Sequence, residues 1–223
     1  MQRDANRRAC VIADFYSIRN NVPIVLRTSR TTRFSVVVLC SVLVALIVGQ
    51  IVRPGFTEYW GYQLFQISVT LVVVMLFDAA FKQEGGMTWQ THALIIGATL
   101  ADTLGNAGMM YDRLGHYDKI VHFASGAAIA VLAYQALRYL ESRGMLMYSP
   151  VRRAVLAVLV SLLLAGVLWE TYEFLSDFVF SSERVYGWTD TAGDLIVDVI
   201  GATLAVCVVL LAQVRTAQSS KAM

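Results

Sequence analysis

Charged residues are scarce in this sequence. Aspartate, glutamate, lysine and arginine make up 15% of its 223 residues, whereas hydrophobic residues make up 57%. This balance excludes a soluble domain and an intrinsically disordered chain. The apolar runs are about 20 residues long and lack the alternating ~10-residue pattern of barrel strands, so they predict transmembrane helices. The sequence has no repeat of fixed period and no low-complexity stretch.

The sequence also predicts neither disulfide bonds nor a cleavable signal peptide. Of the three cysteines, Cys10 falls in a basic tail, and Cys40 and Cys207 fall in the predicted cytoplasmic halves of helices, on the reducing side. The basic region before the first apolar run is too long for a secretory signal. No small-residue cleavage site ends that run at Ile47–Ile51, so we expect the first helix to be retained.

We predict an all-α membrane bundle of six transmembrane helices. They cover Phe34–Ile51, Trp60–Phe81, Thr88–Met110, Lys119–Leu140, Ala154–Phe180 and Thr189–Val214. Asp102, Asn106 and several glycines interrupt the third, which is either continuous, broken or partly re-entrant. The predicted organisation is a basic tail over residues 1–33, a membrane domain over 34–214 and a second tail over 215–223, with no separate soluble domain.

The basic residues predict the orientation. Fourteen of the eighteen fall on one side: Arg3, Arg7, Arg8, Arg19, Arg27, Arg30, Arg33, Lys82, Arg138, Arg143, Arg152, Arg153, Arg215 and Lys221. The opposite side has only Arg53, Arg113, Lys119 and Arg184. Because cytoplasmic loops carry the excess of lysine and arginine, both termini are expected in the cytoplasm of a multi-pass protein.

The acidic residues concentrate on the outward side. Eleven of sixteen lie there: Glu58, Asp102, Asp112, Asp118, Glu170, Glu173, Asp177, Glu183, Asp190, Asp194 and Asp198. A charge near the bilayer centre costs at least ~2.5–3.5 kcal/mol on insertion scales. Such groups must face the bundle interior and must pair, bind a cation or be protonated.

The spacing of these acids places them on shared helix faces. Asp190, Asp194 and Asp198 recur every four residues, Glu170, Glu173 and Asp177 follow an i, i+3, i+7 pattern, and Asp118 and His122 are an i, i+4 pair. The nearby cations are too few, so either several acids are protonated or a divalent metal sits among them. The metal would be Zn²⁺, Mn²⁺, Mg²⁺ or Ca²⁺. Its predicted ligands are Asp118, His122, Glu170, Glu173 and Asp198.

Three segments resemble a known family. They are YDRLGHYDKIVHFASG over Tyr111–Gly126, WETYEF over Trp169–Phe174 and DTAGDLIVDVIGA over Asp190–Ala202. Together they resemble the bacterial YjdF-like inner-membrane proteins, which have no assigned activity. More distantly, they resemble the VanZ-like membrane proteins, linked to glycopeptide-antibiotic tolerance. The resemblance implies the bacterial inner membrane and a link to the cell envelope, but no reaction. Its motif residues are Asp118, Lys119, His122, Glu170, Glu173, Asp190, Asp194 and Asp198.

Three functions fit these observations. The first is an enzyme acting on a lipid or lipid-linked envelope substrate, with catalytic candidates Asp190, Lys119 and Asp194, the last as a base, and with Lys119 and Arg113 holding phosphate. The second is a proton or metal-cation transporter, although the inner halves of the helices are almost purely apolar. The third is a structural or sensing protein. The expected partners are membrane lipids and not nucleic acid.

Overall fold

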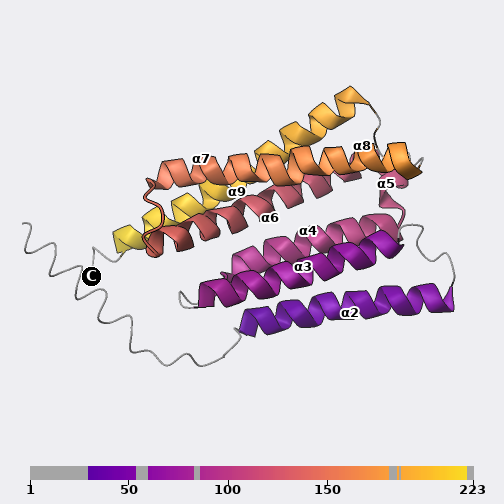
Figure 1. Ribbon diagram of the computed structural model, residues 1–223, viewed down its shortest axis with the longest axis horizontal. Helices are drawn as coiled ribbons and strands as arrows, with labels where there is room; N and C mark the ends of the chain where they lie inside the picture. The colour runs from indigo at the N-terminus through magenta and orange to yellow at the C-terminus, as the bar shows by residue number, and fades with distance from the viewer. Residues whose placement is uncertain (1–29, 54–59, 83–85, 181–184, 186, 220–223) are drawn as a thin grey trace, which may run out of the picture.

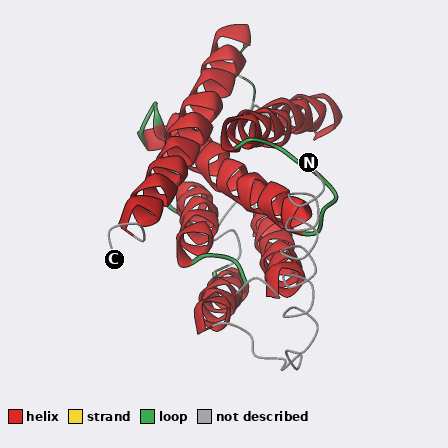
Figure 2. Cartoon of the chain, turned by 90° about the vertical axis from the view of Figure 1, so that its left-hand side faces the viewer, coloured by secondary structure: helices red, strands yellow, loops and turns green. Residues whose placement is uncertain are grey.

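The computed structural model describes residues 30–53, 60–82, 86–180, 185 and 187–219, and the regular elements of this part are all helices (Figure 2). The order is α2 (Arg30–Val52), α3 (Trp60–Phe81), α4 (Trp89–Ala107), α5 (Met110–Arg113), α6 (Tyr117–Ser142), α7 (Pro150–Ser161), the π-helix η2 (Leu162–Val167), α8 (Leu168–Phe180) and α9 (Trp188–Ser219). Residues 1–29 of the basic tail (with Cys10), Glu58, Glu84, Glu183, Arg184 and Lys221 lie outside the described residues.

Within the described part, five helical stretches are long and apolar enough to cross a membrane: α2, α3, α6, Pro150–Leu175 and the α9 segment Trp188–Gln213. The third predicted span corresponds to α4, which is not among these five. It is nevertheless an unbroken α-helix, started by the Thr88 side chain, which accepts a hydrogen bond from the Thr91 N–H. The all-helical fold is therefore confirmed, while the count of six spans and the cytoplasmic location of both termini stay predictions.

The helices form two layers (Figure 1). In one layer α2, α3 and α4 pack around a core that includes Leu39, Ile67, Val74 and Ile95. In the other, α6 packs against α7 and α9 through smaller residues, including Ala130, Ala157 and Ala202. The layers meet mainly where α4 lies against α6.

The backbones of α6 and α9 touch at two glycines. A Cβ atom on Gly126 would lie 2.5 Å from the Asp198 carbonyl oxygen, and one on Gly201 would lie 2.2 Å from the Phe123 carbonyl oxygen. Small residues allow this close approach between membrane helices. The contact places the His122 face of α6 directly against the Asp198 face of α9.

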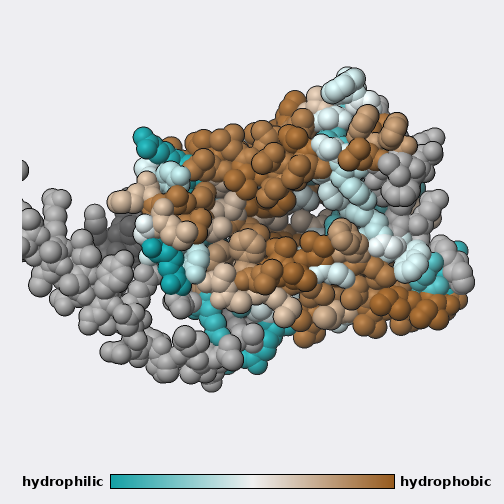
Figure 3. Space-filling view, in the orientation of Figure 1, coloured by the Kyte–Doolittle hydropathy of each residue, from teal (hydrophilic) through white to brown (hydrophobic). Residues whose placement is uncertain are grey.

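The surface is apolar along the middle of the bundle and polar toward its two ends (Figure 3). Large apolar side chains such as Phe34, Phe65 and Ile196 are exposed. An apolar belt of this extent is typical of a surface that faces lipid.

Candidate functional site

All eight predicted site residues come from three neighbouring helices. Asp118, Lys119 and His122 lie on α6, Glu170 and Glu173 on α8, and Asp190, Asp194 and Asp198 on α9. His122, Glu170, Asp194 and Asp198 are buried, with exposed fractions of 8% or less. The remaining four are partly exposed.

One ring nitrogen of His122 faces three carboxylates. The Nε2 atom lies 3.7 Å from Asp118 Oδ1, 3.8 Å from Asp194 Oδ1 and 3.9 Å from Glu170 Oε1. The ligand atoms of Asp118, His122 and Asp194 lie within 4.8 Å of one another, so these three residues form one group that could hold a metal ion. Glu173 joins a second group, in which its ligand atom lies within 4.8 Å of those of His122 and Glu170.

The other ring nitrogen of His122 faces a different acid. Its Nδ1 atom lies 3.2 Å from Asp198 Oδ2. An ionised carboxylate can only accept, so when Asp198 is ionised Nδ1 donates this hydrogen bond, and Nε2 keeps a free lone pair if the ring is neutral. The structure therefore puts Asp198 on the side of the ring opposite to Asp118, Glu170 and Asp194.

Lys119 is held by the carboxylates around it. Its Nζ atom lies 2.5 Å from Asp190 Oδ1, 2.7 Å from Asp194 Oδ1 and 3.6 Å from Asp118 Oδ2. These contacts tie the outer ends of α6 and α9 together and leave Lys119 little freedom to bind a substrate phosphate. Arg113, the other predicted phosphate ligand, is exposed on the short helix α5.

The carboxylates outnumber the cations in this cluster. Four acids (Asp118, Glu170, Asp194 and Asp198) face His122, and a fifth, Asp190, pairs with Lys119. Lys119 is the only lysine or arginine that pairs with these acids among the described residues. Glu170 Oε1 and Asp198 Oδ1 are buried without a hydrogen-bond partner in the same part of the chain. Buried carboxylate oxygens without partners are costly, and a bound cation would satisfy Glu170 Oε1, which faces His122 Nε2.

The π-helix η2 sets the position of α8 in this cluster. Its wider turn lies between the α7 and α8 segments of one continuous helical stretch, immediately before Glu170. Gly166 within it packs against α9: a Cβ there would lie 2.7 Å from Leu195 Cδ2 and 3.3 Å from Asp198 Oδ2. Single π turns inside α-helices occur frequently at functional sites.

His122 also lines a cavity of about 330 Å³. The cavity lies between α3 and α4 on one side and α6, η2 and α8 on the other, and most of its lining is apolar. On α6 it extends from His122 to Leu132, which is about 15 Å along the helix. Its deeper lining includes Val73 and Ile129, so it becomes apolar away from the cluster.

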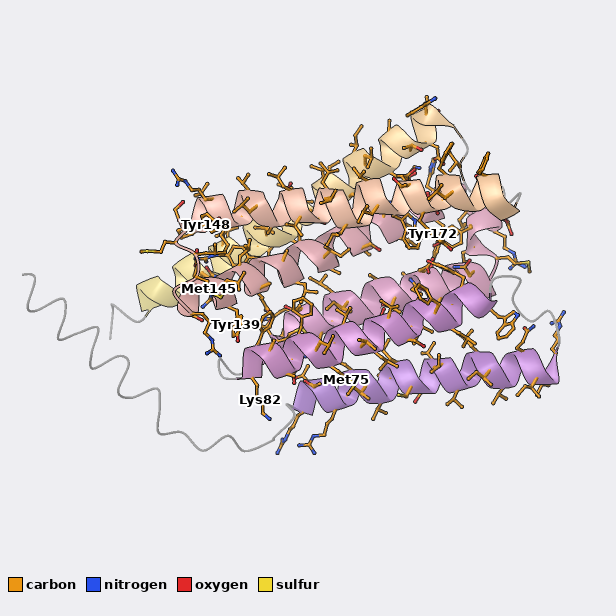
Figure 4. All side chains as sticks on the ribbon, viewed as in Figure 1. Met75, Lys82, Tyr139, Met145, Tyr148 and Tyr172 are labelled. Atoms are coloured by element: carbon orange, nitrogen blue, oxygen red, sulfur yellow. The ribbon has the colours of Figure 1, made fainter. Side chains whose placement is uncertain are left out.

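Aromatic rings join the two layers beside His122. Tyr62 of α3 stacks on Tyr172 of α8 and meets Trp169 edge-on, at centroid distances of 6.3 Å and 5.9 Å. Tyr172, labelled in Figure 4, lies on the side of α8 that faces α3 and α4. Tyr62 and Trp169 both line the cavity. Trp169 belongs to the WETYEF segment that carries the family resemblance, whereas nothing in the sequence pointed to Tyr62.

Asp102, the acid of α4, also lines the cavity but has its own partners. Its carboxylate accepts hydrogen bonds from Tyr111 at 2.5 Å, Asn106 at 3.0 Å and Tyr62 at 3.2 Å. Burial and the neighbouring Asp102 charge raise the pKa of Tyr111, so its hydroxyl remains a donor. These bonds explain how α4 continues past a buried acid.

Comparison with known proteins gives two matches. A family model described as "Predicted membrane protein (DUF2238)" matches residues 34–215. An uncharacterised protein of Thermotoga maritima is 30% identical over 166 residues, which cover 72% of this chain and 82% of the relative. No solved structure matches. The resemblance to YjdF-like and VanZ-like proteins stays a prediction.

Proposed function

The chain belongs to the DUF2238 family of membrane proteins, and on this premise we propose that it is a metal-dependent membrane enzyme acting on a lipid or lipid-linked substrate. One observation carries the proposal. His122 belongs both to a cluster of buried carboxylates and to the wall of a mostly apolar cavity among membrane helices. A site of this kind brings a polar headgroup to the carboxylates while an apolar chain fills the cavity.

The proposed metal ligands are His122 Nε2, Asp118, Glu170 and Asp194, with Glu173 as a further candidate. A divalent ion there would polarise a phosphoryl or carbonyl oxygen and lower the pKa of bound water. Asp198 orients the imidazole through Nδ1, as carboxylates do behind metal-bound histidines. In this arrangement Asp198 acts as a positioning residue. Lys119 offsets part of the negative charge and holds Asp190 and Asp194 in place.

The cavity supports a lipid as the substrate class. Its length of about 15 Å along α6 is half the thickness of a bilayer hydrocarbon core of about 30 Å, the depth that one acyl chain occupies. Its volume of about 330 Å³ is within the range of small-molecule sites. We place the protein in the bacterial inner membrane, with the cluster in the outer half of the bilayer.

Cation or proton transport is the alternative, and the cavity argues against it. Transport needs polar groups along a path through the membrane. The cavity instead leads from His122 toward Val73, Ile129 and Leu132. An apolar extension of this kind favours a hydrocarbon chain over a hydrated ion.

The test is lipid turnover in proteoliposomes made with a bacterial lipid extract and supplied with Zn²⁺, Mn²⁺ or Mg²⁺. Mass spectrometry of the lipids would follow the reaction. Asp194→Asn should abolish turnover. Ile129→Trp should fill the cavity and abolish turnover while metal content stays unchanged. Ile120→Trp is the matched control, because Ile120 is on the same helix, is exposed and does not line the cavity.

Two results would contradict the proposal. One is a wild-type protein that binds metal but converts no lipid of the extract under any of the three metals. The other is turnover that continues undiminished in Ile129→Trp. Metal or proton flux through the same proteoliposomes, lost in Asp194→Asn, would support the transport alternative instead.

A further inference from the structure

A second hollow lies on another side of α6 and runs from Phe123, next to His122 in the sequence, toward the opposite end of the bundle. It is a groove of about 1220 Å³ between α4, α6 and α9. Phe123 and Val131 of α6, Leu94 of α4, and Leu204 and Val208 of α9 form its apolar part. From Phe123 to Arg138 it extends about 22 Å along α6.

One end of this groove is polar and basic. It is lined by Thr88, Gln135, Arg138, Glu141, Ser142, Arg153 and Gln213. Arg138 is exposed, whereas Arg153 is buried, with an exposed fraction of 9%. These two arginines face a single carboxylate in the lining, that of Glu141, so this end has a net positive charge.

Arg153, which lines the groove, has one guanidinium nitrogen without a hydrogen-bond partner among the described residues. Its Nη2 pairs with Glu141 Oε2, and its Nη1 donates to the Tyr134 hydroxyl at 3.1 Å. That hydroxyl donates in turn to Gln213 Oε1 at 3.0 Å. The Nε–H of Arg153 is buried and has no hydrogen-bond partner among the described residues. A buried guanidinium N–H without a partner indicates a missing acceptor.

We propose that this groove binds one anionic phospholipid. The acyl chains lie along α6 and α9, and the phosphate accepts hydrogen bonds from Arg138 and from Arg153 Nε. Guanidinium groups bind phosphate oxygens through charge-assisted hydrogen bonds. Basic pockets between membrane helices bind anionic headgroups for the same reason. This site is separate from the His122 cluster and does not depend on the proposed enzyme activity.

The charge of the groove favours a lipid over a second copy of the chain. Two copies in one membrane with the same orientation would bring like ends together, and an isologous contact through this groove would juxtapose their Arg138 side chains. An anionic lipid, together with Glu141, instead neutralises both arginines. Its acyl chains fill the apolar length of the groove.

The experiment is native mass spectrometry of the full chain in detergent, titrated with phosphatidylglycerol or phosphatidylcholine of identical acyl chains. A contribution of about 1 kcal/mol from one arginine corresponds to a ratio of about fivefold in affinity. We therefore expect a single phosphatidylglycerol to bind about fivefold or more tightly than phosphatidylcholine. Arg138→Gln should remove most of this preference. Leu204→Trp should weaken the binding of both lipids, because it occupies the apolar part of the groove.

Arg143→Gln is the matched control. Arg143 is also an exposed arginine near the end of α6, but it stacks on Tyr139 and does not line the groove. Equal binding of the two lipids by wild type would mean adventitious annular lipid only and would overturn the proposal. Equal loss of preference in Arg138→Gln and Arg143→Gln would overturn it too, as would a dimer that excludes lipid from the groove.

Discussion

Buried charges lie at both ends of α6, in two different settings. At its C-terminal end, Arg153 pairs with Glu141 and binds Tyr134, which binds Gln213. At its N-terminal end, four carboxylates face His122, and Lys119 pairs with two of the cluster's acids and with a fifth, Asp190. The first set contains one buried pair of opposite sign, and its excess charge is an exposed arginine. The second has a large excess of one sign, much of it buried.

This difference separates a structural role from a functional one. A paired set can hold helices together without any further partner, although its contribution to stability is small. A cluster with several uncompensated buried carboxylates is unstable unless a cation binds or protons are taken up. For this reason our metal proposal rests on the acids near His122 and not on the pair near Arg153.

The largest effect is expected from breaking the ion pair between Arg153 and Glu141. Arg153→Met leaves the Glu141 carboxylate without its cation and should lower the free energy of unfolding by about 3 kcal/mol. Thermal unfolding in detergent would measure this loss. The double variant Arg153→Met, Glu141→Gln should recover most of it, and metal content should not change in either. A metal loss in Arg153→Met that the double variant does not restore would show that the two ends are not independent.

A smaller effect is expected from separating the helices that form the cluster. Gly201→Ala places a methyl group against the Phe123 carbonyl oxygen and should cost about 1–3 kcal/mol. It should also weaken metal binding, because α6 and α9 carry the facing residues. Gly97→Ala is the control, since a Cβ there meets nothing within 4 Å. Calorimetric metal titration of both variants would test this, and equal affinity in the two would contradict it.

The sequence predicts the helices well where their apolar runs are uniform. The second predicted span has the bounds of α3, Trp60–Phe81. The third was less certain, because Asp102 and Asn106 looked like interruptions. Their side chains bond to each other, and Tyr111 and Tyr62 complete the set. These partners come from other helices, so local sequence could not supply them. Similarly, the six residues Leu162–Val167 are uniformly apolar, and nothing in them distinguishes a π turn from an α turn.

The spacing of the acids also predicts which residues gather, but not their roles. Helical periodicity put Asp190, Asp194 and Asp198 on one face, and the structure has them there. It could not show which ring nitrogen of His122 meets Asp198, because that depends on the crossing of α6 and α9 at Gly126. His92 is a further case. Its place near the start of an apolar span suggests an interfacial residue, whereas it is buried, with Nδ1 2.9 Å from Ser35 Oγ.

The smallest of these effects is expected from Asp198→Asn. It keeps the shape of the side chain but weakens the bond that orients His122, and should lower metal affinity by 10–100-fold, the range for such supporting residues. Asp190→Asn is the control, because Asp190 pairs with Lys119 and not with His122. A metal titration that finds Asp198→Asn no weaker than Asp190→Asn would remove Asp198 from its positioning role.

The most direct test of the account is the metal content of the purified protein. Elemental analysis would compare wild type with the double variant His122→Ala, Glu170→Ala and with a matched pair at the other end, His92→Ala, Asp78→Ala, where a buried histidine also lies 4.0 Å from an acid. We predict close to one divalent metal per chain in wild type and in the His92 and Asp78 variant, and none in the His122 and Glu170 variant. Absence of metal from the wild type after purification with each candidate ion supplied would contradict the metal centre and favour protonated carboxylates.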